Sequence, residues 1–234
     1  MRPTPAADGR NATDAHRGRN DHASGTPATG EPVISIPYEW PNMNDDAMGR
    51  FPVPDRAELP DDVEDRIHEE TERAGFTPNV FSAFAYKPSH FRAFFAYHDA
   101  LTEDTPLERE EVEMLIVTVS GINDCLYCVV AHGALLRIFA GAPKLADQLA
   151  TNHRSADLSG SHREMLNFAE KLTENPGTVG ETDIERLREA GFSEEEIWDI
   201  ASVVSFFNLS NRMATLIDMR PNDEFYRMGR GDDE

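Results

Sequence analysis

Long apolar runs and cysteine are both scarce in this chain of 234 residues. No stretch approaches the roughly 18 to 20 uninterrupted apolar residues that a membrane span needs, and the N-terminus lacks the apolar core of a secretory signal. We therefore expect a soluble, cytoplasmic protein that has no membrane partner. The length favours one compact domain with tails. Only two cysteines are present, and in a reducing compartment a pair three positions apart indicates a redox or metal site rather than a structural disulfide.

Basic side chains are also few. The chain has 22 Lys and Arg residues against 43 Asp and Glu residues, a formal net charge of −21, and lysine occurs only at Lys87, Lys144 and Lys171. A nucleic-acid backbone is bound by clustered Lys and Arg, so the composition excludes nucleic acid as a partner. The acidic residues are spread along the chain, and concentrated salt screens their mutual repulsion. We interpret this composition as that of a halophilic cytosolic protein.

The sequence divides into four segments. Residues 1–32 are rich in small and polar residues without apolar periodicity, which predicts a disordered leader. Residues 33–59 contain scattered prolines and aromatics and are expected to form an extended arm. Residues 60–219 are expected to form a helical domain, and residues 220–234 a short acidic tail. The predicted fold class is therefore all-α, with six or more helices.

Helix boundaries are indicated by capping signals. Four pairs match a capping box, in which Ser or Thr is followed three residues later by Glu: Thr105 with Glu108, Ser161 with Glu164, Thr182 with Glu185, and Ser193 with Glu196. Pro106 would occupy the first helical position after Thr105. Helix ends are predicted at Gly141, before Pro176 and Gly177, and at Gly191.

Apolar patterns complete the helical prediction. Residues 115–119 and 200–207 are β-branched or aromatic enough for buried strands, but the caps upstream and the extent of each pattern favour helices. Residues 197–219 are apolar on almost every face, which predicts a helix that is central or covered by another subunit. One further helix face carries Phe91, Phe94, Phe95 and Leu101. We expect this face to be core, with the wall of a substrate pocket as the alternative.

The chemically informative residues are Cys125, Cys128 and His132. If a helix begins near Asp124 or Cys125, these three side chains fall within an arc of about 60° on one helix face. Cys125, at the N-terminus of this helix, is favoured as thiolate. His132 lies one turn beyond Cys128 and could accept its proton, so Cys128 is the expected nucleophile. Its sulfenic acid would then condense with Cys125 to form a disulfide.

The same residues allow other interpretations. Glu113 lies beside an apolar stripe in the preceding helix, where its carboxylate could orient His132 or supply it with a proton. Zinc is an alternative, because Cys125, Cys128 and His132 are suitable ligands, although a structural site needs a fourth. A non-catalytic, redox-sensing oligomeric scaffold is another alternative. Taken singly, each residue also fits a purely structural role, since an isolated Cys-x-x-Cys is a weak signal.

The joint spacing is more specific. Glu113, a gap of eleven residues, Cys125-x-x-Cys128 and then x-x-x-His132 resembles the signature of alkyl hydroperoxidase D-type proteins in the carboxymuconolactone decarboxylase-like superfamily. The resemblance implies an all-α alkyl hydroperoxidase D-like fold, assembly into homo-oligomers, and a dithiol/disulfide cycle that reduces peroxides or passes electrons to a peroxidase. It implies a dithiol reductant protein or small thiol as donor and no bound cofactor. By position, Cys125 and Cys128 would be the redox pair, His132 the base and Glu113 the carboxylate of a proton relay.

Three details refine the resemblance. Well-known members have a histidine directly before the second cysteine, whereas this chain has Tyr127, whose phenol stays protonated near neutral pH. A relay through that position is therefore doubtful. The segment Phe207 to Arg212 resembles the peroxidase-related branch of the superfamily. The decarboxylase branch generally lacks the cysteine pair, so its presence argues against lactone decarboxylation.

Overall fold

The computed structural model describes residues 49–230, and within this range the chain forms ten α-helices and no strand. The all-α prediction is confirmed. The expected leader (1–32) and most of the expected arm (33–59) lie outside the described residues. The described end of the arm contains one short 3₁₀ helix, Arg56–Glu58. No helix among residues 49–230 is both long and apolar enough to span a bilayer.

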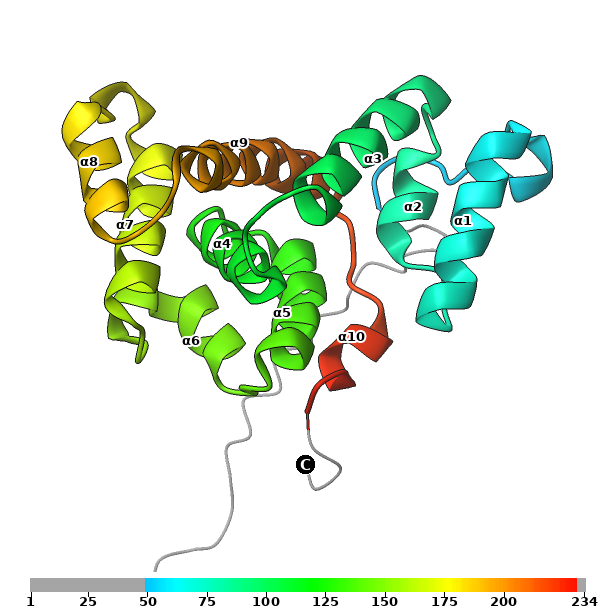
Figure 1. Cartoon of the computed structure of the whole chain (residues 1–234). Helices are drawn as coiled ribbons and strands as arrows, with labels where there is room; N and C mark the ends of the chain where they lie inside the picture. The colour runs from blue at the N-terminus through cyan, green and yellow to red at the C-terminus, as the bar shows by residue number, and fades with distance from the viewer. Residues whose placement is uncertain (1–48, 231–234) are drawn as a thin grey trace, which may run out of the picture. The chain divides into compact units, whose positions relative to one another are not determined.

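Helices α4 (Arg109–Ile122) and α5 (Leu126–Ala140) pack against each other at the centre of the domain (Figure 1). Every residue of α4 from Val112 to Ser120 is buried, because this helix is also contacted by α6 (Leu145–Asn152), α7 (Gly160–Glu174) and α9 (Glu194–Ile217). The predicted helical state of residues 115–119 is thus confirmed, and their β-branched side chains are explained by burial on all sides of α4.

Three helices form the opposite side of the domain from α7 and from α8 (Glu181–Glu189): α1 (Asp61–Ala74), α2 (Asn79–Phe84) and α3 (Pro88–Glu103) (Figure 1). Aromatic packing joins α2 to α3, and the rings of Phe81 and Phe95 stack with centroids 4.3 Å apart. The four residues expected in the core are all buried: Phe91, Phe94, Phe95 and Leu101. That expectation is confirmed.

The helical domain continues past residue 219. Within the expected tail, α10 (Asp223–Arg227) packs against α5 and buries Phe225. The guanidinium of Arg137 in α5 donates to the carbonyl oxygens of Phe225 and Met228, each at 2.8 Å. Two main-chain acceptors are satisfied in this way, so the segment is held to the domain by more than its single aromatic side chain.

Of the four predicted capping boxes, only the one at the start of α9 is correct. Ser193 Oγ accepts from the amide of Glu196 at 3.2 Å, and Glu196 Oε2 accepts from the amide of Ser193 at 2.7 Å. The other three helices begin at different residues from those predicted. Their observed N-caps are Glu108 in place of Thr105, Ser159 in place of Ser161, and Gly180 in place of Thr182. Before α4, Thr105 Oγ1 accepts instead from the amide of Leu107, whose side chain is buried. Burial of Leu107 therefore holds Pro106 in a turn and delays the helix.

The predicted helix ends are closer to the structure. Helix α5 ends at Gly141, which adopts the left-handed conformation at φ 58°, a conformation that glycine reaches without steric cost. Helix α7 ends at Glu174, just before Pro176, and Gly191 follows α8 closely. Glycine and proline act through their own backbone restrictions, so these signals depend little on packing.

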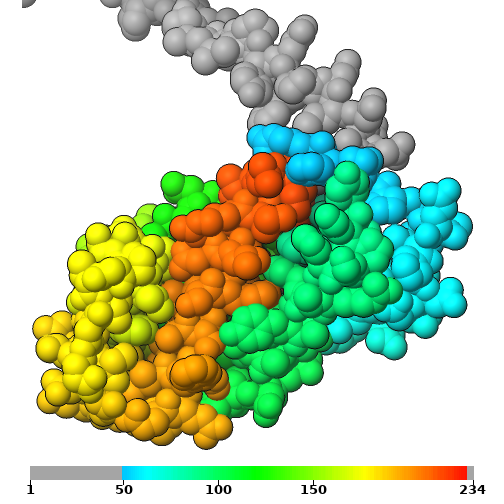
Figure 2. Space-filling model, turned by 90° about the horizontal axis from the view of Figure 1, so that it is seen from above, coloured from blue at the N-terminus to red at the C-terminus, as the bar shows by residue number. Residues whose placement is uncertain are grey.

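Helix α9 is not central. Its buried side faces α4 and α7, but Trp198, Leu209 and Leu216 are exposed, Trp198 at 75%. Figure 2 shows α9 at the surface between the yellow segment that contains α7 and α8 and the green segment that contains α3. The residues at 200–207 are helical as predicted. Of the two expectations for this segment, a central helix is wrong, because within the described domain α9 is covered along one side only. Cover by another subunit stays a prediction.

Gly121 allows close approach of α4 and α6. A Cβ atom at this position would lie 2.4 Å from the carbonyl oxygen of Ala150, so Gly121→Ala is expected to destabilise the protein by about 1–3 kcal/mol through overpacking. Gly133→Ala in α5 is the matched control. Its Cβ would meet no atom closer than 3.5 Å, and alanine within a helix is favoured by roughly 0.5–1 kcal/mol. Urea denaturation, monitored by circular dichroism, measures the free energy of unfolding of both variants. Equal values for Gly121→Ala and Gly133→Ala would contradict the packing argument.

Candidate active site

The turn between α4 and α5 places both cysteines at the start of α5. Asp124 has a positive φ of 53°, and this reversal lets the amide of Cys125 donate to the carbonyl of Ser120 at 2.9 Å. Cys125 is the N-cap residue of α5, and its carbonyl accepts the first helical hydrogen bond, from Val129. The predicted helix start is confirmed, and Cys128 therefore lies in the first turn.

The two thiols are buried and unlinked, and the pKa of each is shifted by the other. The hydrogen bond from Cys128 lowers the pKa of Cys125, and the backbone amides of Tyr127 and Cys128 at the helix N-terminus lower it further, whereas burial opposes them. The same contact raises the pKa of Cys128, and burial adds to the rise. Cys125 is therefore the sulfur that carries the negative charge when the pair loses a proton.

His132 forms a charged cluster with α4. Its Nδ1 lies 2.8 Å from Oε2 of Glu113, a carboxylate with no exposed surface. The other oxygen of Glu113 lies 2.9 Å from Nη2 of Arg109, so the buried negative charge is compensated. A neutral imidazole donating from Nδ1 to a carboxylate has its Nε2 free to accept a proton. This arrangement equips His132 to act as a base.

Tyr127 has a structural contact of its own. Its hydroxyl oxygen accepts a hydrogen bond from the amide of Val80 at 3.2 Å, which ties α5 to α2. Burial raises the pKa of this phenol, so the hydroxyl stays protonated across the physiological range. The neutral Tyr127 side chain therefore links α5 to α2.

A cavity of about 550 Å³ opens onto the thiol and imidazole groups, and both Cys128 and His132 line it. Cys125 is not among the lining residues. Much of the wall is aromatic and comes from α2, α3, α5 and α9: Phe81, Phe84, Phe94, Phe95, Phe139 and Phe207. The face of α3 that was expected to be core is therefore also a pocket wall, since Phe94 and Phe95 serve both roles.

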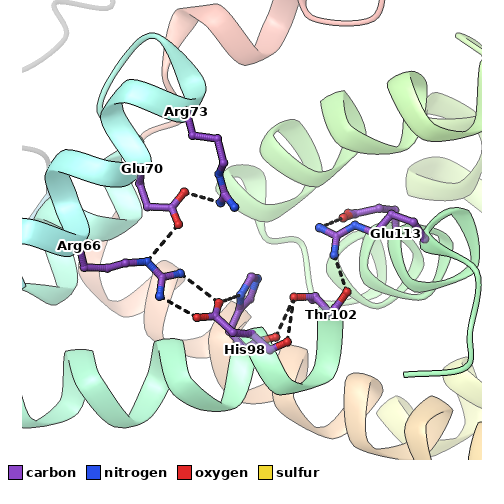
Figure 3. A network of polar contacts seen from close by, with 8 residues as sticks. Arg66, Glu70, Arg73, His98, Thr102 and Glu113 are labelled. Atoms are coloured by element: carbon purple, nitrogen blue, oxygen red, sulfur yellow. Dashed lines mark hydrogen bonds and ion pairs between the residues drawn. The ribbon is translucent and has the colours of Figure 1, made fainter. Parts of the chain in front are cut away.

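Polar groups line another part of the cavity (Figure 3). The nearly buried Glu70 pairs with both Arg66 and Arg73, and Arg66 reaches Asp99 at 2.7 Å, which ties α1 to α3. Burial alone would favour the protonated acid at Asp99, but hydrogen bonds from His98 and Arg66 outweigh it and hold the pKa of this carboxyl well below its ordinary value. Asp99 is therefore ionised.

Glu113 lies across from Glu70 and Arg73 in the same view (Figure 3), and it pairs with Arg109. Arg109 Nη1 also donates to the carbonyl of Thr102 at 2.9 Å, and its guanidinium lies 5.2 Å from the ring centroid of Phe139. Thr102, Phe139 and Arg109 all line the cavity. The residue that neutralises Glu113 is thus itself part of the pocket wall.

Sequence patterns missed two residues of α9 that act on the thiols. The side chain of Asn211 lowers the pKa of both cysteines, and that of Ser210 lowers the pKa of Cys128. Asn211 is completely buried. The available signal was the occurrence of these polar residues inside the apolar stretch 197–219. They also lie in the Phe207–Arg212 segment, to which no role had been assigned.

The zinc alternative gains no support from the described part of the chain. Between residues 49 and 230, no three His, Cys, Asp or Glu side chains are grouped closely enough to hold a metal ion. Nδ1 of His132 is occupied by Glu113. The predicted site residues are brought together as a thiol pair and an imidazole–carboxylate pair, and their roles in a reaction stay predictions.

Comparison with known proteins identifies the domain. Residues 88–171 match the model of the carboxymuconolactone decarboxylase family. A solved structure described as an alkylhydroperoxidase AhpD core, an uncharacterized peroxidase-related protein from Ralstonia eutropha JMP134, is 54% identical, with a TM-score of 0.77 over 79% of this chain and 97% of that one. An uncharacterized peroxidase-related protein from Silicibacter sp. TM1040 is 38% identical, with a TM-score of 0.75 over 81% and 98% of the two chains.

A more distant structure is the debrominase Bmp8, solved as a variant in complex with 2,3,4-tribromopyrrole. It is 16% identical, with a TM-score of 0.63 over 75% of this chain and 92% of that one, a likeness that shows the fold alone. No curated protein matches the chain. On the identity and coverage of the two peroxidase-related structures, this chain belongs to the carboxymuconolactone decarboxylase family, among its AhpD-like, peroxidase-related members.

Proposed function

We propose that this protein is a thiol-dependent peroxidase that reduces neutral organic hydroperoxides through a Cys125–Cys128 dithiol/disulfide cycle. The observation that carries the proposal is the division of the thiol pair. Cys128 and His132 line one aromatic cavity, whereas Cys125 does not line this cavity. Cys125 instead interacts with Cys128. A substrate in the cavity therefore meets one sulfur, and the second sulfur is in place to resolve the product.

The first step oxidises Cys128. His132 accepts the thiol proton at Nε2, and the thiolate attacks the terminal oxygen of R–O–O–H. The O–O bond breaks, Cys128 becomes a sulfenic acid, and the alkoxide takes the proton back from the imidazolium to leave as R–OH. The raised pKa of Cys128 makes a base necessary here, and Glu113 stabilises the imidazolium that forms.

The second step forms the disulfide. The Cys125 thiolate attacks the sulfenic sulfur of Cys128, the S–O bond breaks, and hydroxide leaves as water with the remaining proton. The lowered pKa of Cys125 favours this step because the attacking sulfur is the more readily ionised of the two. In total, R–O–O–H and two thiols become R–OH, water and one disulfide, and a donor of two electrons and two protons must then regenerate the dithiol.

The substrate class follows from the size and charge of the cavity. A volume of about 550 Å³ is within the roughly 300–1,000 Å³ of pockets that hold small organic molecules, and hydrogen peroxide would fill little of it. The ionisable groups on the wall include carboxylates of Glu70, Asp99 and Glu103 against the cations of Arg73 and Arg109. Together with the chain's net charge of −21, this balance disfavours anionic substrates.

The remaining parts of the proposal come from the family. We expect a dithiol protein or small thiol as the electron donor, with transfer of electrons to a separate peroxidase as the alternative use of the same cycle. Assembly into homo-oligomers belongs to the proposal too. So does a cytoplasmic location, because a dithiol cycle depends on a reducing compartment.

An anaerobic thiol count tests the function. One equivalent of cumene hydroperoxide added to the reduced protein is expected to remove both thiols, yield cumyl alcohol, and leave an internal Cys125–Cys128 link found by mass spectrometry. Cumyl alcohol alone serves as the control, and hydrogen peroxide at equal concentration is expected to react more slowly.

Three outcomes are informative. Unchanged thiols after an hour with the hydroperoxide would refute the proposal. Oxidation followed by no further turnover with excess dithiothreitol would favour the redox-sensing scaffold. Stoichiometric zinc in the purified protein, with no titratable thiols, would restore the metal alternative.

A further inference from the structure

A second imidazole faces the cavity, from α3. His98 lines the same cavity as Cys128 and His132, and Figure 3 shows its ring pointing from α3 into the space between Glu70 and Glu113. This ring has no part in the proposed dithiol cycle. Pockets of this size orient their ligands through a few polar groups on a mainly apolar wall, and His98 is placed to be one of those groups.

A carboxylate and an arginine fix the tautomer of this ring, as they do at His132. Nδ1 of His98 lies 3.1 Å from Oδ1 of Asp99, and the two oxygens of Asp99 accept from the guanidinium of Arg66 at 2.7 and 3.1 Å. The Asp99 carboxylate is ionised and can only accept, so the hydrogen of a neutral His98 ring is on Nδ1. Nε2 of this ring is then a hydrogen-bond acceptor.

Packing holds the ring and its carboxylate in place. The centroid of the His98 ring lies 6.4 Å from that of Phe95 and 6.1 Å from that of Phe206. Arg66 belongs to α1, so the Asp99 carboxylate is held between two helices. Nε2 therefore has a fixed direction, and a ligand group that meets it loses little further freedom.

The carboxylates of this network are already paired. Both oxygens of Asp99 bond to Arg66, and the oxygens of Glu70 pair with Arg66 and Arg73. No residue between 49 and 230, by contrast, bonds to Nε2 of His98. Because the acidic charges are compensated by the arginines, the acceptor at His98 suits a neutral donor, such as a hydroxyl group, better than an ion.

Phe207 lies next to the imidazoles at both ends of the cavity. Its ring centroid is 4.9 Å from that of His132 and 6.3 Å from that of His98, and Phe207 lines the cavity with both. A substrate whose aromatic ring lies beside Phe207 can therefore present a peroxide to Cys128 and a second polar group to His98.

We propose that His98 forms a subsite for a hydroxyl group of the substrate, so that the preferred substrates are organic hydroperoxides with an alcohol across one aromatic ring from the peroxide. The hydroxyl donates to Nε2 of His98, and Asp99 is the positioning residue of that ring. The peroxide end of this substrate rests on the proposed function, whereas binding of the hydroxyl does not. An analogue without the hydroxyl leaves Nε2 buried against an apolar group, and such a site rejects it.

Two hydroperoxides of nearly the same shape test the subsite. One is cumene hydroperoxide with a para dimethylcarbinol group, and the other has a para tert-butyl group, in which a methyl replaces the hydroxyl. Wild-type protein, with dithiothreitol at about pH 8 to keep imidazoles neutral, is expected to show a kcat/KM about tenfold higher for the carbinol.

Two variants locate this preference. His98→Phe keeps an aromatic ring but removes the acceptor, so the ratio of the two kcat/KM values is expected to fall about tenfold or more. A merely structural defect would lower both values and leave their ratio unchanged. His90→Phe is the matched control, because it makes the same substitution at an exposed position of α3 outside the cavity, and it should keep the wild-type ratio.

Binding of the product alcohols makes the test independent of peroxide chemistry. Calorimetry compares the diol, which is cumyl alcohol with a para dimethylcarbinol group, with cumyl alcohol that has a para tert-butyl group. Wild-type protein is expected to bind the diol about tenfold more tightly, and His98→Phe is expected to remove the difference. Should His98→Phe fail to fold by circular dichroism, the wild-type affinities for the two alcohols still decide.

The outcomes separate this inference from the proposed function. Equal wild-type affinities for the two alcohols, or no binding of either, would overturn the subsite, and so would a wild-type ratio in folded His98→Phe. A protein that prefers the diol but consumes neither hydroperoxide would overturn the peroxidase proposal and still support the subsite. Consumption of both hydroperoxides at equal kcat/KM would support the peroxidase proposal and overturn the subsite.

Discussion

Replacing Cys128 with serine is expected to abolish hydroperoxide consumption. The remaining thiol, Cys125, does not line the cavity, so a bulky hydroperoxide held there meets a serine hydroxyl, which His132 cannot convert into a comparable nucleophile. The reaction is run with excess dithiothreitol as reductant, and a ferrous-ion peroxide assay measures how fast cumene hydroperoxide is lost. Consumption at the wild-type rate would rule out the proposed mechanism.

Cys125→Ser is expected to abolish turnover at a different step. Cys128 still faces the cavity, so one equivalent of hydroperoxide is consumed and a sulfenic acid remains that dimedone traps. The Cys125 sulfur, which raises the pKa of Cys128, is removed at the same time, and its loss is expected to change the rate of this single event. Trapping in Cys128→Ser instead of Cys125→Ser would reverse the assignment of attacking and resolving sulfurs.

Glu113→Gln is expected to lower kcat by roughly 100-fold or more, within the range for losing general base catalysis. The amide cannot compensate the positive charge of an imidazolium, although it is close in shape to the carboxylate. Loss of the carboxylate also leaves Arg109 without a charged partner at 2.9 Å, and about 1–3 kcal/mol of stability is expected to be lost with it. Steady-state kinetics and urea denaturation measure the two effects.

Glu110→Gln, in the first turn of the same helix, is the matched control for this substitution. It removes one negative charge from α4 without touching His132, so kcat is expected to stay at the wild-type value. An unchanged kcat in Glu113→Gln, or an equal fall in both variants, would show that the carboxylate does not act through His132.

Local patterns in the sequence were sufficient for the fold class and for one face of the site. The 3.6-residue period of a helix is enough to bring Cys125, Cys128 and His132 to one side of α5, and the helix start at Cys125 follows the predicted position. Gly141 and Pro176 ended helices where expected, because their backbone restrictions act whatever surrounds them. The capping boxes were less dependable, since an alternative turn around the buried Leu107 displaced the one at Thr105.

The sequence by itself thus determined an all-helical protein with a pair of thiols at the start of one helix. Tertiary structure alone decided that Asn211, 83 residues beyond Cys128 in the chain, lies where it lowers the pKa of both thiols, and that the aromatic faces of α2, α3, α5 and α9 enclose one cavity. The physical reason is the distance along the chain over which each interaction acts. Helix periodicity and capping act within a few residues, whereas burial, hydrogen bonding and charge at the site depend on which distant helices pack together.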